Sequence, residues 1–267
     1  MVLNGWRSVL VFLTAVFTLT HAQECADYGL IDWIKSVGGT FAPQQELRFL
    51  DDGVTMGVFA TADISEGTVL SEIPWEYIIV DESDETPEEK KQRTFTKLGP
   101  ERLRLGCATV RKLAQALQDP QPTPYIEYLK AQPRNILPAF WSDQGKALLQ
   151  DLLGGIQTVS VPPYDLLRPV EYDWQRLCDG GTLDDDNDVT RQALELVVTR
   201  ADDKRMVPGY DLYNHDNQPN AQAVATPGVK HTVRAIQPIR AGEQIVVSYN
   251  MCPECGGRRE DYGTPGE

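Results

Sequence analysis

The sequence has little positive charge for its size. It holds 25 Lys and Arg residues against 39 Asp and Glu residues, which gives a net charge of −14. Such an excess of acid repels phosphate backbones, so direct binding of nucleic acid is disfavoured. A basic partner, such as a lysine-rich protein segment, is attracted instead.

Histidine and cysteine, the usual ligands of zinc, are also scarce. The chain has three His and five Cys residues, and an odd number of cysteines makes no tidy disulfide framework. Cys252 and Cys255 have the spacing of half a zinc site or of a redox pair. A complete zinc site would need Cys107 or Cys178 to converge on them in space. The alternative is a tail with two exposed cysteines or a disulfide between these neighbours.

Long apolar runs are missing after the N-terminus, so no later stretch reaches the roughly 20 residues of a membrane span. The first 22 residues differ, because one charge, Arg7, precedes an apolar run over 9–19 and Ala22 offers a small residue at its exit. This layout is typical of a secretory signal peptide. An uncleaved anchor and a fortuitous apolar start are the alternatives. We expect cleavage to leave no stable membrane span and to direct the protein to the endoplasmic reticulum lumen or outside the cell.

The remaining chain, which has no internal repeats, predicts short strands at both ends and helices between them. The period-2 runs and turn residues predict strands over 47–50, 58–60, 68–74, 221–225, 232–236 and 245–247. The spacing of apolar residues predicts helices over 31–37, 103–117, 124–132, 147–153 and 194–198. Neither strand set can bury a core alone, so the two sets must pair across the helical middle. The fold class is therefore α+β. The charge run 81–91 is expected to be a solvated loop.

One polar segment stands out among these elements. It runs Asp211-Leu212-Tyr213-Asn214-His215 and is followed by Pro219-Asn220. Taken alone it is a weak signal, because a lone histidine is more often structural than catalytic and Asn214 is also a common turn residue.

Its flanks make the segment specific. Three parts of the sequence resemble, in this order, the blocks of SET-domain protein methyltransferases. They are 57–61 with Asp63-Ile64 and Glu66-Gly67, then 211–215 with Pro219-Asn220, and finally 233–236 with Ile239, 241–245 and Ser248-Tyr249. Residues 124–129 and 140–142 are similar to the helical insert of one branch, that of the plant RuBisCO large-subunit methyltransferase. The resemblance covers about 220 residues.

The resemblance implies a domain organisation. Residues 1–22 form the signal peptide, 26–250 the SET-type fold of short β-sheets with a helical insert over about 81–200, and 251–267 a short cysteine-containing tail. The branch's C-terminal helical domain, which helps to hold the protein substrate, has no counterpart here. A truncated sequence and a minimal enzyme are both compatible with this.

The resemblance also implies a cofactor, S-adenosylmethionine, and the residues that contact it. Met56, Gly57 and Val58 lie against it, although the family usually has Gly-x-Gly where this chain has Thr55-Met56-Gly57. Arg200 pairs with its carboxylate through a planar guanidinium; a surface arginine at a helix end is the alternative. Asn214 and His215 contact the cofactor and position it.

Tyr249 is implied as the catalytic residue, with no metal required for methyl transfer. Tyr213 and Tyr262 are the candidates for contact with the substrate, a protein with an exposed lysine. Two positions depart from the family, because Asn250 follows Tyr249 where glycine is usual and Thr264 replaces a phenylalanine after Tyr262-Gly263.

The function implied is that of an S-adenosylmethionine-dependent protein-lysine N-methyltransferase. Histidine methylation occurs in this branch, so the target residue stays open. Two other classes remain: a catalytically inactive SET-like protein-interaction module, and a secreted redox or metal module centred on Cys252 and Cys255. A signal peptide conflicts with the branch's usual nuclear, cytosolic or plastid work, so an organelle-targeting leader is the alternative for residues 1–22.

Overall fold

The structure is a computed structural model that describes residues 28–51, 55–80, 106–137, 141–152, 174–175, 178, 188–202 and 204–249. The segments predicted as a signal peptide (1–22), a charged loop (81–91) and a cysteine-containing tail (251–267) lie outside the described residues.

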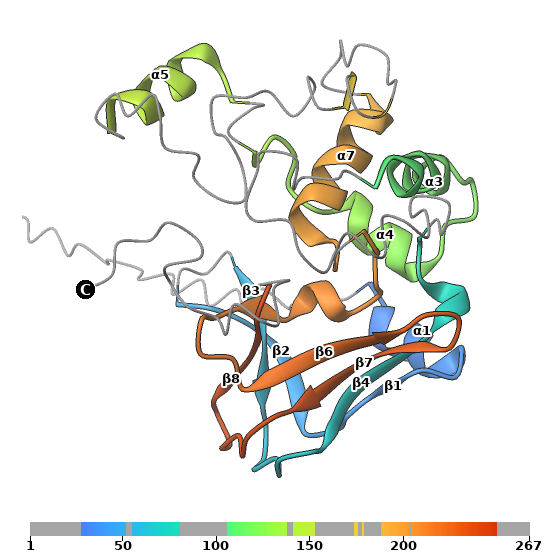
Figure 1. Cartoon of the computed structure of the whole chain (residues 1–267), viewed down its shortest axis with the longest axis vertical. Coiled ribbons are helices and arrows are strands. Elements are labelled where there is room, and N and C mark those ends of the chain that lie inside the picture. The colour runs from blue at the N-terminus through green and yellow to red at the C-terminus, as the bar shows by residue number, and fades with distance from the viewer. Residues whose placement is uncertain are drawn as a thin grey trace, which may run out of the picture.

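Two four-stranded sheets contain the described strands, and each sheet combines strands from both ends of the chain (Figure 1). The first has the order β1 (Thr40–Phe41), β4 (Val69–Pro74), β7 (Lys230–Ala235) and β6 (Ala221–Thr226). The second has the order β2 (Gln45–Phe49), β3 (Met56–Ala60), β8 (Gln244–Val247) and β5 (Asn214–His215). The prediction that the two strand sets pair with each other is therefore confirmed.

Strand pairing follows the alternation of buried and exposed side chains. β3 pairs antiparallel with β8 so that Val58 lies opposite Ile245, and both side chains are fully buried. Each such side chain contributes about 1.5–3 kcal/mol to stability when it leaves water. A shift by one residue would turn these apolar side chains to the opposite face, which fixes the register.

A tight turn that contains Pro227-Gly228 joins β6 to β7 in a hairpin. Gly228 has a positive φ of 73°, which glycine adopts without strain, and the N–H of Val229 donates to the carbonyl of Thr226 at 2.9 Å. The sequence did not predict β1 or β5, because two residues are too few for a period-2 pattern to be recognised.

The described helices are α1 (Leu30–Ser36), α3 (Cys107–Leu117), α4 (Pro124–Lys130), α5 (Asp143–Leu152) and α7 (Val189–Arg200), with single 3₁₀ turns η1 (Trp75–Tyr77) and η5 (Tyr210–Leu212). α4 begins at a proline, and the Thr123 hydroxyl accepts from the N–H of Ile126. Asp188 caps α7 in the same way. Figure 1 shows α3, α4 and α7 grouped together, with α1 beside β1 and β4, and α5 apart from them.

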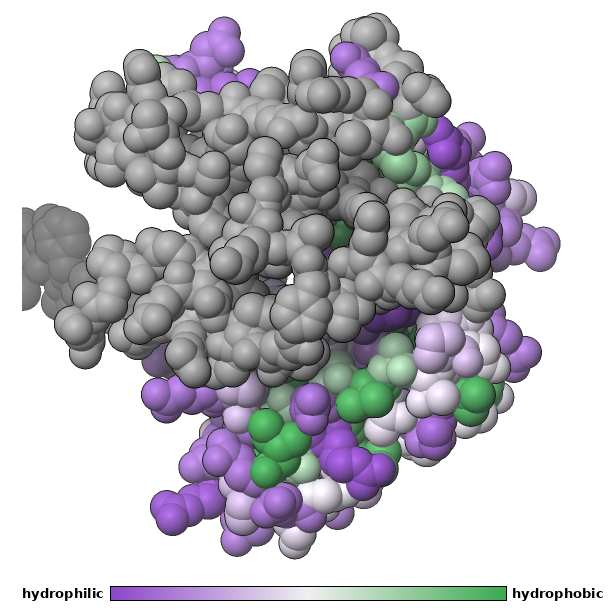
Figure 2. All heavy atoms as spheres, viewed as in Figure 1, coloured by the Kyte–Doolittle hydropathy of each residue, from purple (hydrophilic) through white to green (hydrophobic). Residues whose placement is uncertain are grey.

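One apolar core joins the sheets to the helices. It includes Leu30 and Ile34 of α1, Leu113 of α3 and Leu194 of α7. On the face shown in Figure 2, hydrophobic side chains also reach the surface between hydrophilic ones over the strands. No helix in the described part of the chain is both long and apolar enough to cross a membrane.

A disulfide bond joins Cys107, the first residue of α3, to Cys178, 71 residues later. Arg111 of α3 donates a hydrogen bond to the carbonyl of Cys178, and its guanidinium lies 5.4 Å from the ring centre of the buried Trp174. Cys178 is therefore attached to α3 by a covalent bond and by a hydrogen bond from Arg111, and Trp174 by its contact with the same arginine. The sequence did not predict this pair, and its formation removes both thiols as ligands for the zinc site considered at the C-terminal cysteines.

We expect replacement of both Cys107 and Cys178 by serine to lower the free energy of unfolding by about 2–4 kcal/mol, because a crosslink over a long loop restricts the unfolded chain. Chemical denaturation followed by circular dichroism measures the change. A reducing agent should destabilise the wild type by a similar amount and leave the double variant unchanged. An equal effect of the reducing agent on both proteins would contradict this prediction.

Candidate functional site

Residues from three distant parts of the chain meet beside strand β8. β3 lies antiparallel to β8, and β5 lies parallel to it with Asn214 opposite Val246. The side-chain amide of Asn214 donates to the carbonyl of Met56 on β3 at 2.9 Å. Met56, which the family resemblance places against the cofactor, is thus bonded directly to the Asn-His segment.

Gly57 lies where β3 approaches these side chains most closely. A Cβ atom at this position would lie 2.6 Å from Nε2 of Gln244 and 2.9 Å from Nδ2 of Asn214. Both distances are shorter than van der Waals contact allows, so the position requires glycine or a shift of two side-chain amides. The next residue, Val58, has its side chain in the core, which leaves only its backbone near the site.

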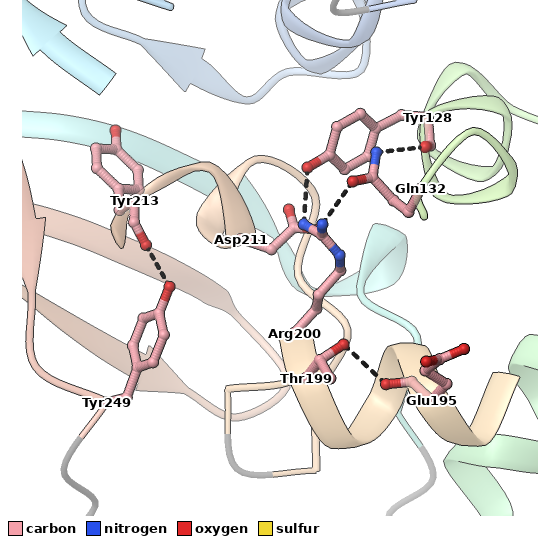
Figure 3. A network of polar contacts seen from close by, with 8 residues as sticks. All are labelled: Tyr128, Gln132, Glu195, Thr199, Arg200, Asp211, Tyr213 and Tyr249. Carbon is pink, nitrogen blue, oxygen red and sulfur yellow. Dashed lines mark hydrogen bonds and ion pairs between the residues drawn. The ribbon is translucent and has the colours of Figure 1, made fainter. Parts of the chain in front are cut away.

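Tyr249 contacts the Asn-His segment through three groups. Its N–H donates to Nδ1 of His215 at 3.0 Å, and its ring centre lies 5.2 Å from the imidazole. Its hydroxyl donates to the carbonyl of Tyr213 at 2.7 Å, as Figure 3 shows. Because Nδ1 of His215 accepts this bond, a neutral His215 has its proton on Nε2. Nothing in this geometry makes His215 a base toward Tyr249.

The Tyr249 hydroxyl stays protonated near neutral pH. Burial of the hydroxyl and the carboxylate of Asp211 raise the pKa of Tyr249 to about 12, and the guanidinium of Arg200 lowers it to a smaller extent. Although 46% of the Tyr249 surface is exposed, its hydroxyl points inward to the backbone. The group therefore acts as a hydrogen-bond donor at a fixed place.

Tyr213 presents its backbone rather than its ring to the site. The side chain is completely buried, and its hydroxyl donates to Oε1 of Gln45 at 3.0 Å. Gln45 in turn donates to the carbonyl of Leu70 at 2.7 Å. The carbonyl of Tyr213, in contrast, accepts from the Tyr249 hydroxyl, so the part of this predicted substrate-binding residue that lies beside Tyr249 is its backbone.

Arg200, the last residue of α7, is held by α4 and by Asp211 (Figure 3). Its Nη1 donates to the Tyr128 hydroxyl at 3.0 Å and its Nη2 donates to Oε1 of Gln132 at 2.5 Å. The same Nη1 lies 3.6 Å from a carboxylate oxygen of Asp211. Arg200 is thus a partly buried member of a polar cluster, and the alternative of a surface arginine is wrong.

Asp211 also belongs to the candidate site, although the sequence pattern predicted no role for it. Its side chain is 1% exposed, and burial raises its pKa to about 6 despite the attraction of Arg200. The signal available was its position three residues before Asn214, in a segment already singled out.

The sequence also predicted no role for Asn220, which binds strand β8. Its side-chain amide donates to the carbonyl of Gln244 at 2.8 Å and accepts from the N–H of Val246 at 2.8 Å. One side chain thereby satisfies two main-chain groups of β8, as a neighbouring strand would. It fixes the strand that leads into Tyr249.

The structure therefore brings together Met56, Gly57, Asn214, His215 and Tyr249, with Arg200 and Asp211 beside them. Tyr262, Asn250 and the pair Cys252 and Cys255 lie outside the described residues.

The chain matches known proteins at the level of family and fold. The family model for the SET domain matches residues 55–250. The solved SET domain of LSMT bound to lysine and AdoHcy is 17% identical with a TM-score of 0.51, over 89% of this chain and 56% of that one. Rubisco LSMT bound to AdoMet is 18% identical with a TM-score of 0.52, over 89% and 56%. Rubisco LSMT bound to sinefungin and monomethyllysine is 16% identical with a TM-score of 0.50, over 90% and 56%.

This chain thus corresponds to 56% of the length of the solved LSMT chains. No curated protein matches it significantly.

Asp211 should give the folded protein a distinctive pH dependence. The folded-state pKa of Asp211 is raised to about 6 by burial, so between pH 4 and 6 the folded chain holds a proton that the unfolded chain has released. Stability from this group is complete below pH 4 and is lost as the pH rises through 6. We expect the unfolding free energy of the wild type, relative to Asp211→Asn, to fall by roughly 3 kcal/mol over this range.

Denaturant titrations of both proteins at several pH values measure this difference. Asp216→Asn is the matched control, since Asp216 is exposed and lies in the same segment. A difference between wild type and Asp211→Asn that stays constant from pH 4 to 7 would show that Asp211 does not titrate in this range.

Proposed function

The chain belongs to the SET-domain family, and on that premise we propose that it is an S-adenosylmethionine-dependent protein-lysine N-methyltransferase. The observation that carries the proposal is the meeting of Met56-Gly57, Asn214 and Tyr249 around strand β8. These three groups lie up to 193 positions apart in the sequence, and each is a residue to which the family resemblance gives a role.

The residues present fit a cofactor of this chemistry. Gly57 has no side chain to cover its backbone, and the side-chain amides of Asn214 and Gln244 lie beside it. Nε2 of Gln244 is buried and has no hydrogen-bond partner among the described residues. A buried donor of this kind fits a ligand rich in acceptor atoms, such as a nucleoside.

In the proposed arrangement, Met56, Gly57 and Val58 hold the cofactor through their backbone. Asn214 and His215 hold it through side-chain and main-chain groups, and Arg200 pairs with its carboxylate. When bound, the cofactor would supply a methyl group on a positively charged sulfur; a neutral amine would bond to the methyl carbon in line as the carbon–sulfur bond breaks, and the sulfur would leave as a neutral thioether.

Catalysis then depends on position and charge. The Tyr249 hydroxyl oxygen and the Tyr213 carbonyl oxygen, 2.7 Å apart, provide two oxygen atoms that can hold a methyl group through weak C–H···O contacts. Fixed dipoles around a cationic centre stabilise it without reorganisation. The attacking lysine has to be neutral, and removal from water lowers the pKa of an amine. Because its own pKa is raised, Tyr249 keeps its proton and orients rather than deprotonates.

The substrate is proposed to be a protein with an exposed lysine in a basic segment. The net charge of −14 favours such a partner and disfavours nucleic acid. Tyr213 would meet the substrate through its carbonyl, and Tyr262 is the proposed wall of the lysine site.

A catalytically inactive SET-like interaction module is the second candidate. Asn250 after Tyr249, and Thr55 before Met56, are the departures from the family pattern that favour it. A methyl-transfer assay distinguishes the two candidates, because both bind a protein and only the first modifies it.

We expect the wild type to transfer labelled methyl from S-adenosylmethionine to protein in a cell lysate. Tyr249→Phe should lower the rate by about 10²-fold or more, since a misplaced reacting group costs about this much. It should leave the Kd for S-adenosylhomocysteine, measured by calorimetry, nearly unchanged.

Tyr28→Phe is the matched control, because Tyr28 is exposed and lies before α1. Unchanged transfer by Tyr249→Phe would remove the role assigned to Tyr249. Cofactor binding by the wild type without any transfer would favour the inactive module.

We further propose that the protein works in the secretory pathway, in the endoplasmic reticulum lumen or outside the cell. The signal-peptide layout of residues 1–22 supports this, and so does the Cys107–Cys178 disulfide, since such bonds persist in oxidising compartments.

Localisation of the tagged protein, with N-terminal sequencing of the mature chain, tests this proposal. We expect a lumenal or secreted chain that begins after about residue 22 and whose Cys107 and Cys178 resist alkylation until reduced. A cytosolic chain that retains Met1 and has both thiols reduced would refute it. Import into another organelle would indicate the alternative leader.

A further inference from the structure

Four strands lie at the edges of the two sheets that the described residues form, and three of them are protected against pairing with another chain. β1 and β5 have two residues each. β2 carries Glu46 and Arg48, which form an ion pair at 3.2 Å. Short strands and charged side chains are the usual means by which proteins block a free sheet edge. β6 has neither, because its six residues are all uncharged and none is proline.

The free edge of β6 presents a row of backbone groups. The N–H of Ile236 donates to the carbonyl of Asn220 at 2.9 Å, which sets the phase of the antiparallel ladder between β6 and β7. Bonded and non-bonded pairs alternate along such a ladder, so the backbone groups of Ala221, Ala223 and Ala225 face away from β7. No described strand lies beyond them, and the described part of the chain offers these groups no other hydrogen-bond partner.

Exposed apolar side chains accompany this edge. Val224 on β6, Val229 in the turn and Ile236 after β7 expose 52%, 58% and 41% of their surfaces. Figure 2 shows hydrophobic side chains at the surface over the strands. A group of exposed apolar side chains beside unpaired backbone groups is typical of a contact with another protein chain.

The charge of the chain indicates which protein this contact fits. The whole chain has a net charge of −14, yet residues 217–229, which include β6, contain no charged residue. A basic partner, which the net charge attracts, would therefore find no acidic side chain on β6. A second copy of the chain would bury no charge there, and the edge matches itself in length and in polarity.

We propose that β6 pairs antiparallel with β6 of a second copy of this chain, so that the two four-stranded sheets form one continuous sheet across a two-fold axis. With Ala223 opposite Ala223 of the second copy, each N–H donates to the carbonyl of the other. Ala221 then pairs in the same way with Ala225 of the second copy, so all three outward residues are bonded. Gln222 lies opposite Val224 of the second copy, and no like charges meet.

Sedimentation of the purified protein over a range of concentrations tests this pairing. We expect the mass of the wild type to rise toward twice that of one chain as the concentration increases. Ala223→Pro removes an N–H that faces away from β7, a position at which an edge strand tolerates proline. It should weaken the dimer by about 10- to 100-fold, since one hydrogen bond is lost from each copy. Val224→Lys should also weaken it, because two lysines would then face each other near the axis.

Leu148→Lys is the matched control, because Leu148 is 60% exposed on α5, which lies apart from the sheets (Figure 1). This variant should dimerise as the wild type does. Amide hydrogen exchange of the wild type gives a second readout that needs no variant to fold. The N–H groups of Ala223 and Ala225 should become protected as the concentration rises, whereas that of Val224, which faces β7, should be protected throughout.

Three results would overturn the inference. They are a wild type with the mass of one chain at every concentration, a dimer that both β6 variants leave unchanged, and exchange at Ala223 that does not depend on concentration. These measurements require no cofactor, so their outcome is independent of the proposed function.

Discussion

The pairing of β8 with two other strands is the constraint on which the rest of the site depends. Its antiparallel bonds to β3 bring Met56 and Gly57 to it, and its parallel pairing with β5 does the same for Asn214 and His215. Tyr249 follows two residues after the strand ends. Main-chain hydrogen bonds thus set the distances between the residues of the candidate site. The Asn220 amide strengthens this arrangement, because it replaces a missing neighbour for two groups of β8.

Charge in this region is concentrated in one buried pair. Burial raises the pKa of Tyr125 and Tyr128 as well as that of Tyr249, so these hydroxyls are neutral under ordinary conditions. Asp211 and Arg200 supply the formal charges among them, and Asp211 titrates closest to neutrality. A surrounding of neutral oxygen atoms and one carboxylate favours a cationic ligand without the large cost of an isolated buried charge.

Sequence patterns predicted most of the fold, and they failed where a feature depends on contacts across the chain. Strands with clear alternation, such as β4 and β8, and helices with caps or prolines, such as α4, were predicted within a few residues. β1 and β5 are too short to show a period. The Cys107–Cys178 bond joins residues that are distant in sequence, and an odd cysteine count hid it. The meeting of Gly57, Asn214 and Tyr249 could be anticipated through the family resemblance, whereas the pairing of Asp211 with Arg200 depends on how α7 packs beside η5.

Tyr213 links the interior of the protein to the candidate site within a single residue. Its hydroxyl donates to Gln45 at the start of β2, and its carbonyl accepts from the Tyr249 hydroxyl. Core and site therefore cannot drift independently during evolution. A change in the volume around the Tyr213 ring would move the carbonyl oxygen that accepts from Tyr249 in the proposed site. We therefore expect fewer natural substitutions at the buried positions around this ring than burial alone would predict.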